Sequence, residues 1–176
     1  MAHDIQIRAA ITADIPAITA IYRQHVLHGL ASFEIEPPDT AEMTRRFRAI
    51  SELGLPYFVA TMGGRLAGYA YAATYRARPA YRFTVEDSVY VDGELPGQGI
   101  GSALMPALIA GCAAAGRRQI IAVIGDSANH GSIKLHEKFG FKHVGLLPAV
   151  GFKFGRWVDS VLMQRDVGQG RLSLPS

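Results

Sequence analysis

A glycine-rich turn joins a strand-like segment to a helix-like segment near the middle of the chain. Residues 84–91 are rich in β-branched residues, and residues 102–115 form an apolar, alanine-rich run. The turn between them, residues 93–101, carries Gly97, Gly99 and Gly101. At a strand-to-helix junction, such glycines leave backbone N–H groups and the positive end of the helix dipole open to phosphate oxygens. The turn therefore predicts an anion-binding site, although a tight turn without a ligand would use the same residues.

Two common phosphate-binding motifs do not fit this turn. A Walker loop ends in Gly-Lys-Ser/Thr, whereas this turn ends in Gly101, Ser102 and Ala103. A dinucleotide-binding turn needs Gly-x-Gly-x-x-Gly in a first β-α-β unit, but Gly101 is followed by Ser102, Ala103 and Leu104, and antiparallel strands are expected before it. The turn is therefore no Walker loop, and hydride chemistry is not expected.

Hydrophobic periodicity predicts a mixed α/β (α+β) domain. A first strand is expected to end near Ala9, and Thr12 is expected to cap a helix whose apolar face reaches Val26. Asp39 and Glu42 have capping-box spacing for a second helix. Later strands are expected at residues 57–62, 65–75, 84–91, 119–124, 141–147 and 158–164, with helices at 102–115 and 129–139 and a hairpin turn at 63–64. This order predicts a mixed sheet with helices on both faces.

Domain organisation follows from length and composition. At 176 residues and 49% hydrophobic content, the chain suits one domain, which we place at residues 1–167, with residues 168–176 as a flexible tail. The net charge is only +3 and the arginines are scattered, so nucleic-acid binding is not expected. Cys112 is the only cysteine and is expected to be a buried apolar residue. No leader or membrane-spanning stretch is visible, so we expect a cytoplasmic protein with no membrane partner.

Several separated segments resemble the GNAT family of N-acetyltransferases. The family's cofactor motif, Gln/Arg-x-x-Gly-x-Gly/Ala, corresponds to residues 96–101, with Pro96 at the position of the usual Gln or Arg. The family's fourth-helix pattern appears as Asn129, Ser132 and residues 135–141. More narrowly, residues 84–91, 135–137 and 151–157 resemble phosphinothricin and methionine sulfoximine acetyltransferases. The resemblance implies the GNAT fold with a mostly antiparallel sheet of about seven strands, acetyl-CoA as cosubstrate, no metal, and a homodimer.

The resemblance also implies roles for two titratable side chains. An ammonium group must lose a proton before it attacks a thioester, and Glu86 is the implied base, acting directly or through water. His136 lies where the family often has a tyrosine that protonates the departing thiolate. Imidazole can act as that acid near neutral pH, can relay the amine proton, or can be hydrogen-bonded in the core without a catalytic role.

By the same resemblance, the cofactor lies along the strand after Glu86 and on the turn. The backbone of Val89 is expected to polarise the thioester carbonyl, and Asn129 can bind the cofactor, cap the fourth helix, or both. Proline has no side-chain donor, so a pyrophosphate contact is missing at Pro96 or comes from Gln98. The full expected cofactor set is Val89, Tyr90, Val91, Gly97, Gln98, Gly99, Ile100, Gly101, Ser102, Asn129 and Lys138.

The acceptor site is expected to combine an apolar wall with cations. Guanidinium groups at Arg76 and Arg78 suit a carboxylate or sulfonyl-type anion, although solvated surface arginines would have the same sequence. Phe152, Lys153 and Trp157 belong to the C-terminal signature, and Trp157 can equally lie in a dimer core. The expected acceptor-binding set is Phe33, Arg76, Ala77, Arg78, Glu86, Asp87 and Ser88.

The sequence thus predicts transfer of an acetyl group from acetyl-CoA to the amine of a small amino-acid-like acceptor. Phosphinothricin, methionine sulfoximine and methionine sulfone are the expected acceptor type, attacking directly in a ternary complex. Two alternatives stay open. Acetylation of a protein N-terminus would need an open peptide groove, and a non-catalytic acyl-CoA-binding module would need no base, against which Glu86 argues.

Overall fold

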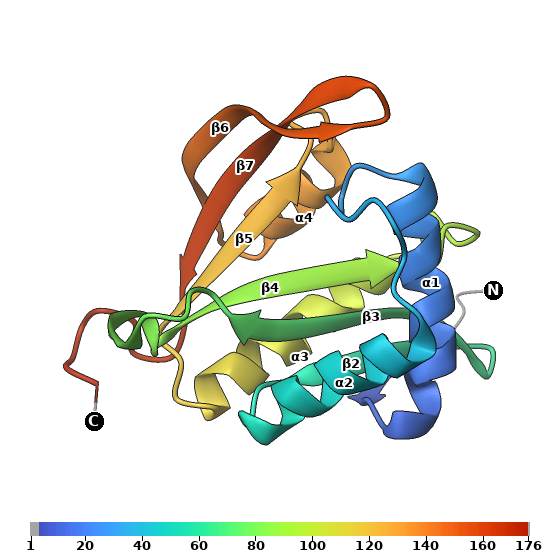
Figure 1. The fold of residues 1–176 in the computed structure, drawn as a ribbon. Coiled ribbons are helices and arrows are strands. Elements are labelled where there is room, and N and C mark those ends of the chain that lie inside the picture. Colours follow the sequence, from blue (N-terminus) through green and yellow to red (C-terminus); the bar gives the residue numbers. More distant parts are fainter. Residues whose placement is uncertain (1–3, 176) are drawn as a thin grey trace.

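The computed structural model describes residues 4–175, which form a seven-stranded sheet with helices on both faces (Figure 1). In chain order the elements are β1 (Ile5–Ala9), α1 (Ile15–His28), α2 (Thr40–Glu52), β2 (Tyr57–Met62), β3 (Arg65–Thr74), β4 (Thr84–Val91), α3 (Ile100–Ala114), β5 (Gln119–Gly125), α4 (His130–Lys138), β6 (Lys142–Lys153) and β7 (Arg156–Asp166). None of the helices between residues 4 and 175 has the length and apolar character needed to cross a bilayer.

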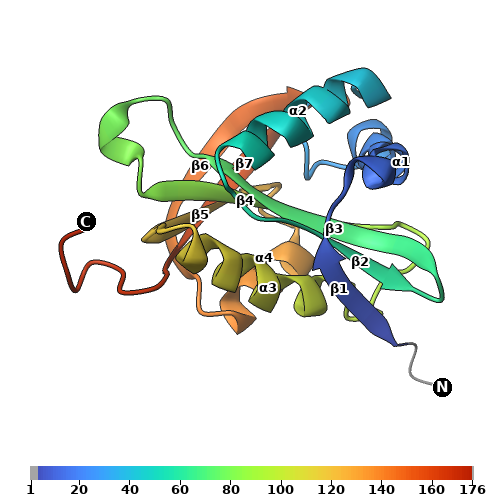
Figure 2. The same ribbon diagram turned by 90° about the horizontal axis from the view of Figure 1, so that it is seen from below.

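The sheet is antiparallel except at its centre. Its strand order is β1-β2-β3-β4-β5-β7-β6, and only β4 and β5 run in parallel. Figure 2 shows α1 and α2 on one face and α3 and α4 on the other. The expected fold class, a mostly antiparallel mixed sheet between helices, is therefore confirmed.

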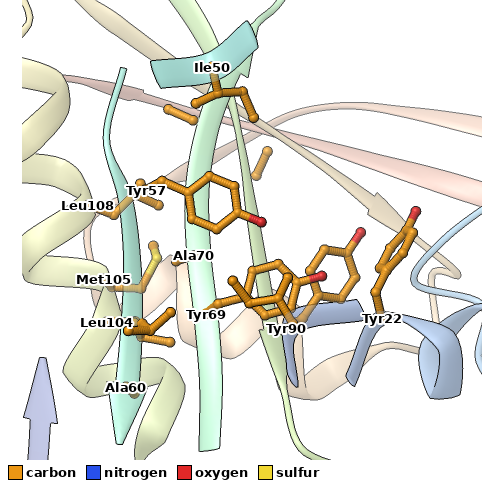
Figure 3. Packing of buried hydrophobic residues seen from close by; sticks show 14 of the residues in the cluster. Tyr22, Ile50, Tyr57, Ala60, Tyr69, Ala70, Tyr90, Leu104, Met105 and Leu108 are labelled. Carbon is orange, nitrogen blue, oxygen red and sulfur yellow. The ribbon is translucent and has the colours of Figure 1, made fainter. Parts of the chain in front are cut away.

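The side chains of adjacent strand residues point to opposite faces, so the sheet carries a core on each side. On the α1–α2 side, Tyr57, Tyr69 and Tyr90 lie in a row that continues to Tyr22 of α1 (Figure 3). Ring centroids in this row are 5.0–6.0 Å apart, from Tyr22–Tyr90 to Tyr57–Tyr69. On the other side, α3 contributes a buried apolar cluster, labelled in Figure 3 as Leu104, Met105 and Leu108. Side chains of both cores pack against β3 and β4, so these two strands are held from both faces of the sheet.

The start of the first helix differs from the prediction. Thr12 does not cap it, because residues Thr12–Asp14 form a 3-10 turn and α1 begins at Ile15. The Asp14 carboxylate instead accepts a hydrogen bond from the Ile11 N–H at 2.9 Å and pairs with Arg8. The cap of the second helix is confirmed, because Asp39 Oδ1 accepts from the Glu42 N–H at 2.8 Å. The third helix begins at Ile100, two residues earlier than expected.

The prediction that the last two strands cover only residues 141–147 and 158–164, which leaves a loop between them, is wrong. β6 continues to Lys153, and a two-residue turn at Phe154 and Gly155, both at positive φ, leads directly into β7. The pairing register shifts between Leu147 and Gly151, where β6 bulges. Bulges and edge strands are the places where a strand tolerates proline and glycine, so Pro148 and Gly151 interrupt the alternation without ending the strand.

Candidate active site

The parallel strands β4 and β5 pair only over their first halves. The register runs from Thr84 opposite Gln119 to Asp87 opposite Ala122, after which the strands diverge (Figure 1). A cavity of about 50 Å³ opens in the gap, lined by Asp87, Ser88, Val89, Tyr90, Ala122, Val123, Ile124, Gly125, Asn129, Ser132 and His136. Beyond Asp87, the edge of β4 that faces β5 is not used by that strand. It can therefore offer backbone groups to an extended amide-bearing ligand, and the expected binding by Val89, Tyr90 and Val91 stays a prediction.

The glycine-rich turn has the backbone geometry that requires glycine. Gly97 and Gly99 have φ of 73° and 78°, in the left-handed region that side chains disfavour. Gly99 is the N-cap of α3 and no side chain caps the helix, so its first-turn N–H groups remain available to an anion. Lys138 of α4 reaches the first turn of α3, since its Nζ donates to Ser102 Oγ at 3.1 Å. The glycine turn, the start of α3 and Lys138 of α4, which all belong to the expected cofactor set, thus lie together at the divergent end of β4.

A second cavity lies on the α1–α2 face of the sheet and is called here the acceptor cavity. It has a volume of about 380 Å³ and is lined by Tyr22, Ala31, Ser32, Phe33, Glu34, Tyr71, Glu86, Ser88, Tyr90, Val123, Gly125 and Ser160. It shares Ala31, Ser88, Tyr90, Val123 and Gly125 with the cavity in the β4–β5 gap. The two cavities therefore meet through the gap, so that ligands approaching from the two faces can contact one another.

Glu86 lines the acceptor cavity near this junction. Its side chain is half-buried, and burial, followed by the negative charge of the neighbouring Asp87, raises the pKa of the Glu86 carboxyl above its usual 4.5. Both effects disfavour the charged carboxylate, which makes it a better proton acceptor than a solvated glutamate.

Asp87 and His136 form a buried pair on the opposite side of β4. His136 Nε2 lies 2.9 Å from Asp87 Oδ2, and His136 Nδ1 lies 2.7 Å from the carbonyl oxygen of Ser132. Burial lowers the pKa of His136, but the hydrogen bond and charge of Asp87, with the Ser132 carbonyl, outweigh it and leave this pKa raised. Both ring nitrogens face oxygen acceptors, so the protonated imidazolium suits this geometry.

This pair bears on two of the expected roles. Asp87, expected among the acceptor-binding residues, faces α4 and the β4–β5 gap instead of the acceptor cavity. His136 has the hydrogen-bonded core position that was one of its three expected roles, and it also lines the gap. A part for it in proton transfer stays a prediction.

Phe33 and the loop after α1 are held by the β6–β7 hairpin. A side-chain carbon added at Gly125 or at Gly151 would lie 3.0 Å or 2.5 Å from atoms of the Phe33 ring, so the ring rests on two positions without side chains. The buried Lys153 donates from Nζ to the carbonyl oxygen of Ser32 at 2.6 Å. These contacts hold Phe33 in the lining of the acceptor cavity, and its contact with an acceptor stays a prediction.

Tyr22 and Glu34 hold the other end of this loop. The Tyr22 hydroxyl donates to Glu34 Oε1 at 2.8 Å and lies 2.8 Å from Ser32 Oγ. Arg46 of α2 pairs with the same carboxylate at 2.6 Å. The negative charge of the Glu34 carboxylate is therefore neutralised by a cation of the protein itself, Arg46.

The expected cations lie elsewhere. Arg76, Ala77 and Arg78 lie in the exposed connection between β3 and β4, where the Arg76 guanidinium stands over the rings of Tyr75 and Tyr81 at 5.2 and 5.8 Å. None of the three belongs to the cavity lining described above, and their contact with an acceptor stays a prediction.

Asn129 caps α4, because its Oδ1 accepts from the Ser132 N–H at 3.2 Å. The cap was one of its two expected roles, and its side chain also borders the β4–β5 gap. Cys112 is fully buried on α3, and burial raises its pKa to about 12. Its thiol is therefore protonated near neutral pH, which fits the expectation of a buried apolar residue.

Sequence reasoning missed several residues of the acceptor cavity. Tyr22 and Tyr71 occupy apolar positions in the periodic pattern of a helix and of a strand. The sequence around them therefore does not indicate that they line a cavity. Ser160 follows Asp159 in the first half of β7, so the sequence around it also gave no local signal. Its proximity to the site depends on pairing between distant strands.

Comparison with known proteins agrees with this geometry. The family described as "Acetyltransferase (GNAT) domain" matches residues 7–162. The chain is 53% identical to a phosphinothricin N-acetyltransferase of Alcaligenes faecalis over 96% of this chain and 86% of that protein. It is 39% identical to the L-methionine sulfoximine/L-methionine sulfone acetyltransferase of Salmonella typhimurium over 93% of this chain and 95% of that protein.

A solved structure shows the same arrangement. The GNAT superfamily phosphinothricin acetyltransferase from Sinorhizobium meliloti, in complex with AcCoA, superposes with a TM-score of 0.95 at 48% identity, covering 100% of this chain and 94% of that one. The family match spans most of the described fold, and the relatives align along nearly the whole chain. Taken with the divergent β4–β5 pair and the glycine turn, these findings show that the chain belongs to the GNAT family of acetyltransferases.

Proposed function

We propose that this chain transfers an acetyl group from acetyl-CoA to the primary amine of a small amino-acid-like acceptor. The observation that carries this proposal is the meeting of the acceptor cavity with the β4–β5 gap beside Glu86. The gap lies next to an uncapped helix N-terminus and Lys138, a combination that fits a phosphate-bearing thioester with an amide-containing arm.

The chain's own residues divide the work between the two faces of the sheet. Acetyl-CoA supplies the activated acetyl thioester when it is bound. The turn at residues 97–101 and Lys138 hold its phosphates, and the free edge of β4 orients its arm. Glu86 removes the proton from the acceptor ammonium, and the Val89 N–H stabilises negative charge on the thioester carbonyl. Cys112 takes no part, so the amine attacks the acetyl carbon directly: the amide C–N bond forms, the thioester C–S bond breaks, and the thiolate of CoA leaves and takes up a proton.

The acceptors named for the relatives set the substrate class that we propose here. We expect phosphinothricin, methionine sulfoximine and methionine sulfone to serve as acceptors, since the 380 Å³ cavity combines the Phe33 wall with several hydroxyl groups. Purified protein with acetyl-CoA should release free thiol when one of these amines is added. No thiol release with any of them would overturn the substrate claim.

The same assay separates the alternatives. A protein N-terminal acetyltransferase would release thiol with peptides in place of free amino acids. A non-catalytic binding module would bind acetyl-CoA and release no thiol with either kind of amine.

We also propose a cytoplasmic location, because a lone buried thiol suits a reducing compartment.

We further propose that the chain forms a homodimer through β6 and the β6–β7 turn. The edge strand β6 exposes Leu146 at 53% and Phe152 at 58%, and Trp157, which pairs with Phe152 at the start of β7, is 67% exposed. Exposed apolar edge strands are ready-made pairing surfaces. The hairpin also carries Gly151 and Lys153, which hold the Phe33 loop. Pairing there would stiffen the acceptor cavity.

Leu146→Glu is expected to shift the protein from dimer to monomer in sedimentation velocity at micromolar concentration, because it places a charge in the proposed apolar interface. Ile11→Glu is the matched control, since Ile11 is also exposed, at 56%, but lies before α1, away from β6. A wild-type monomer, or a Leu146→Glu dimer, would contradict this assignment of the interface.

A further inference from the structure

We infer that the hydroxyl group of Ser160 binds the distal oxygen of the acceptor, meaning a sulfonyl, sulfoximine or phosphinate oxygen at the far end from the reacting amine. The inference deepens the proposed function and rests on it. It gives Ser160 the role of a specificity-determining residue.

The first argument is the hydrogen-bonding state of Ser160. Its residue exposure is 3%, and its Oγ has no hydrogen-bond partner among residues 4–175. Leaving a buried hydroxyl unpaired costs free energy, and native proteins seldom do so without a reason. Two other hydroxyls of the same cavity, those of Tyr22 and Ser32, are satisfied internally by their 2.8 Å contact. Ser160 is thus a polar group prepared for a partner that the protein itself does not supply.

The second argument is the face on which Ser160 lies. Ser160 pairs with Gly125 of β5, and Glu86 pairs with Ile121 of the same strand. Paired residues point to the same face of a sheet, and every second residue of a strand does so too, so Ile121, Val123 and Gly125 share one face. Ser160 and Glu86 therefore both face the acceptor cavity, whose lining includes them both.

The third argument is the spacing along β5. Along β5, Val123 lies midway between Ile121, which pairs with Glu86, and Gly125, which pairs with Ser160. Val123 lines both cavities, so we place the reacting amine near it, where the acceptor and the thioester can meet. From Val123 to Gly125 the strand rises by about 7 Å, at about 3.3 Å per residue. An acceptor with a polar oxygen about five bonds from its amine spans this length when extended, which is the separation in methionine sulfone.

The fourth argument is the immediate surroundings of Ser160. Its pairing partner on β5 is Gly125, and the Leu30 carbonyl oxygen and the Phe33 ring lie where a side chain at that position would be. The Phe33 ring rests against Gly125 and Gly151, on the strands that flank β7. An acceptor's methylene groups would contact this ring while its terminal oxygen accepts a hydrogen bond from Ser160.

The test compares wild type, Ser160→Ala and the control Ser51→Ala with methionine sulfone as acceptor. We expect Ser160→Ala to raise the KM for methionine sulfone about tenfold and to leave the KM for acetyl-CoA within about twofold. The melting temperature of the free variant should be equal to or higher than that of wild type, because the substitution removes an unpaired polar atom. Ser51→Ala, which loses only a local hydrogen bond to the Phe47 carbonyl, should leave both KM values unchanged.

The outcomes separate this inference from the proposed function. If wild type itself releases no thiol with methionine sulfone, the proposed function fails. If wild type is active and Ser160→Ala keeps the wild-type KM for methionine sulfone, the Ser160 inference alone is overturned. A parallel rise in the KM for acetyl-CoA, or a melting temperature several degrees lower, would also overturn it, since the hydroxyl would then serve the cofactor or the fold. Ser160→Cys, nearly isosteric with a weaker donor, should give a KM between those of wild type and Ser160→Ala.

Discussion

Glu86→Gln is expected to lower kcat by about 10²- to 10⁴-fold while the KM for acetyl-CoA stays within about twofold. Glutamine keeps the shape and polarity of the side chain but cannot accept a proton from the acceptor ammonium. The carboxylate lines the acceptor cavity and lies apart from the turn that we propose to hold the phosphates, so cofactor binding should be unaffected. Initial rates of thiol release, with each substrate varied in turn, measure both quantities.

The pH dependence gives an independent check of Glu86. Its pKa is raised above 4.5 by burial and by the charge of Asp87, so the protonated, inactive form persists to higher pH than in a solvated glutamate. For wild type, kcat/KM should therefore fall as the pH drops through this raised pKa, and the variant should lose that limb of the profile. Glu52→Gln, on the exposed end of α2, is the control and should match wild type. An unchanged kcat in Glu86→Gln would remove this residue from the mechanism.

Local signals in the sequence were sufficient for most of the fold. The hairpin between β2 and β3 was predictable because its two turn residues, Gly63 and Gly64, stand between alternating apolar segments. The extent of β6 was not, because a bulge near Pro148 breaks the alternation on which strand prediction depends. The late start of α1, at Ile15, was missed for a different reason, since the Asp14 carboxylate accepts a hydrogen bond from the Ile11 N–H and stabilises a 3-10 turn before the helix.

The site was predictable only in part. Glu86 and the glycine turn follow from motifs that are contiguous in sequence. The acceptor cavity instead joins α1, the loop after it, β3, β4, β5 and β7, so its composition depends on strand order. Ser160 illustrates this, because its position opposite Gly125 arises from pairing across 35 residues, for which the sequence contains no local signal.

Asp87→Ala is expected to destabilise the protein by about 3–5 kcal/mol near pH 6, measured by urea unfolding. The Asp87 side chain is wholly buried and His136 is 5% exposed, so the substitution leaves a buried imidazolium without its partner. The exposed pair of His143 and Glu137 provides the matched control, with side-chain exposures of 52% and 49%. Glu137→Ala should cost no more than about 1 kcal/mol, because an exposed ion pair contributes little.

The sign of the pH dependence distinguishes an ion pair from simple loss of packing. The pKa of His136 in the folded protein is raised above 6.5, so folding favours the protonated ring. The stabilisation from this charge is complete below about pH 6.5 and is lost as the pH rises through the folded pKa. The destabilisation caused by Asp87→Ala should therefore shrink from pH 6 towards pH 9. A constant difference across this range would mean that Asp87 supports the fold through packing alone, and that His136 is neutral while it lines the cofactor gap.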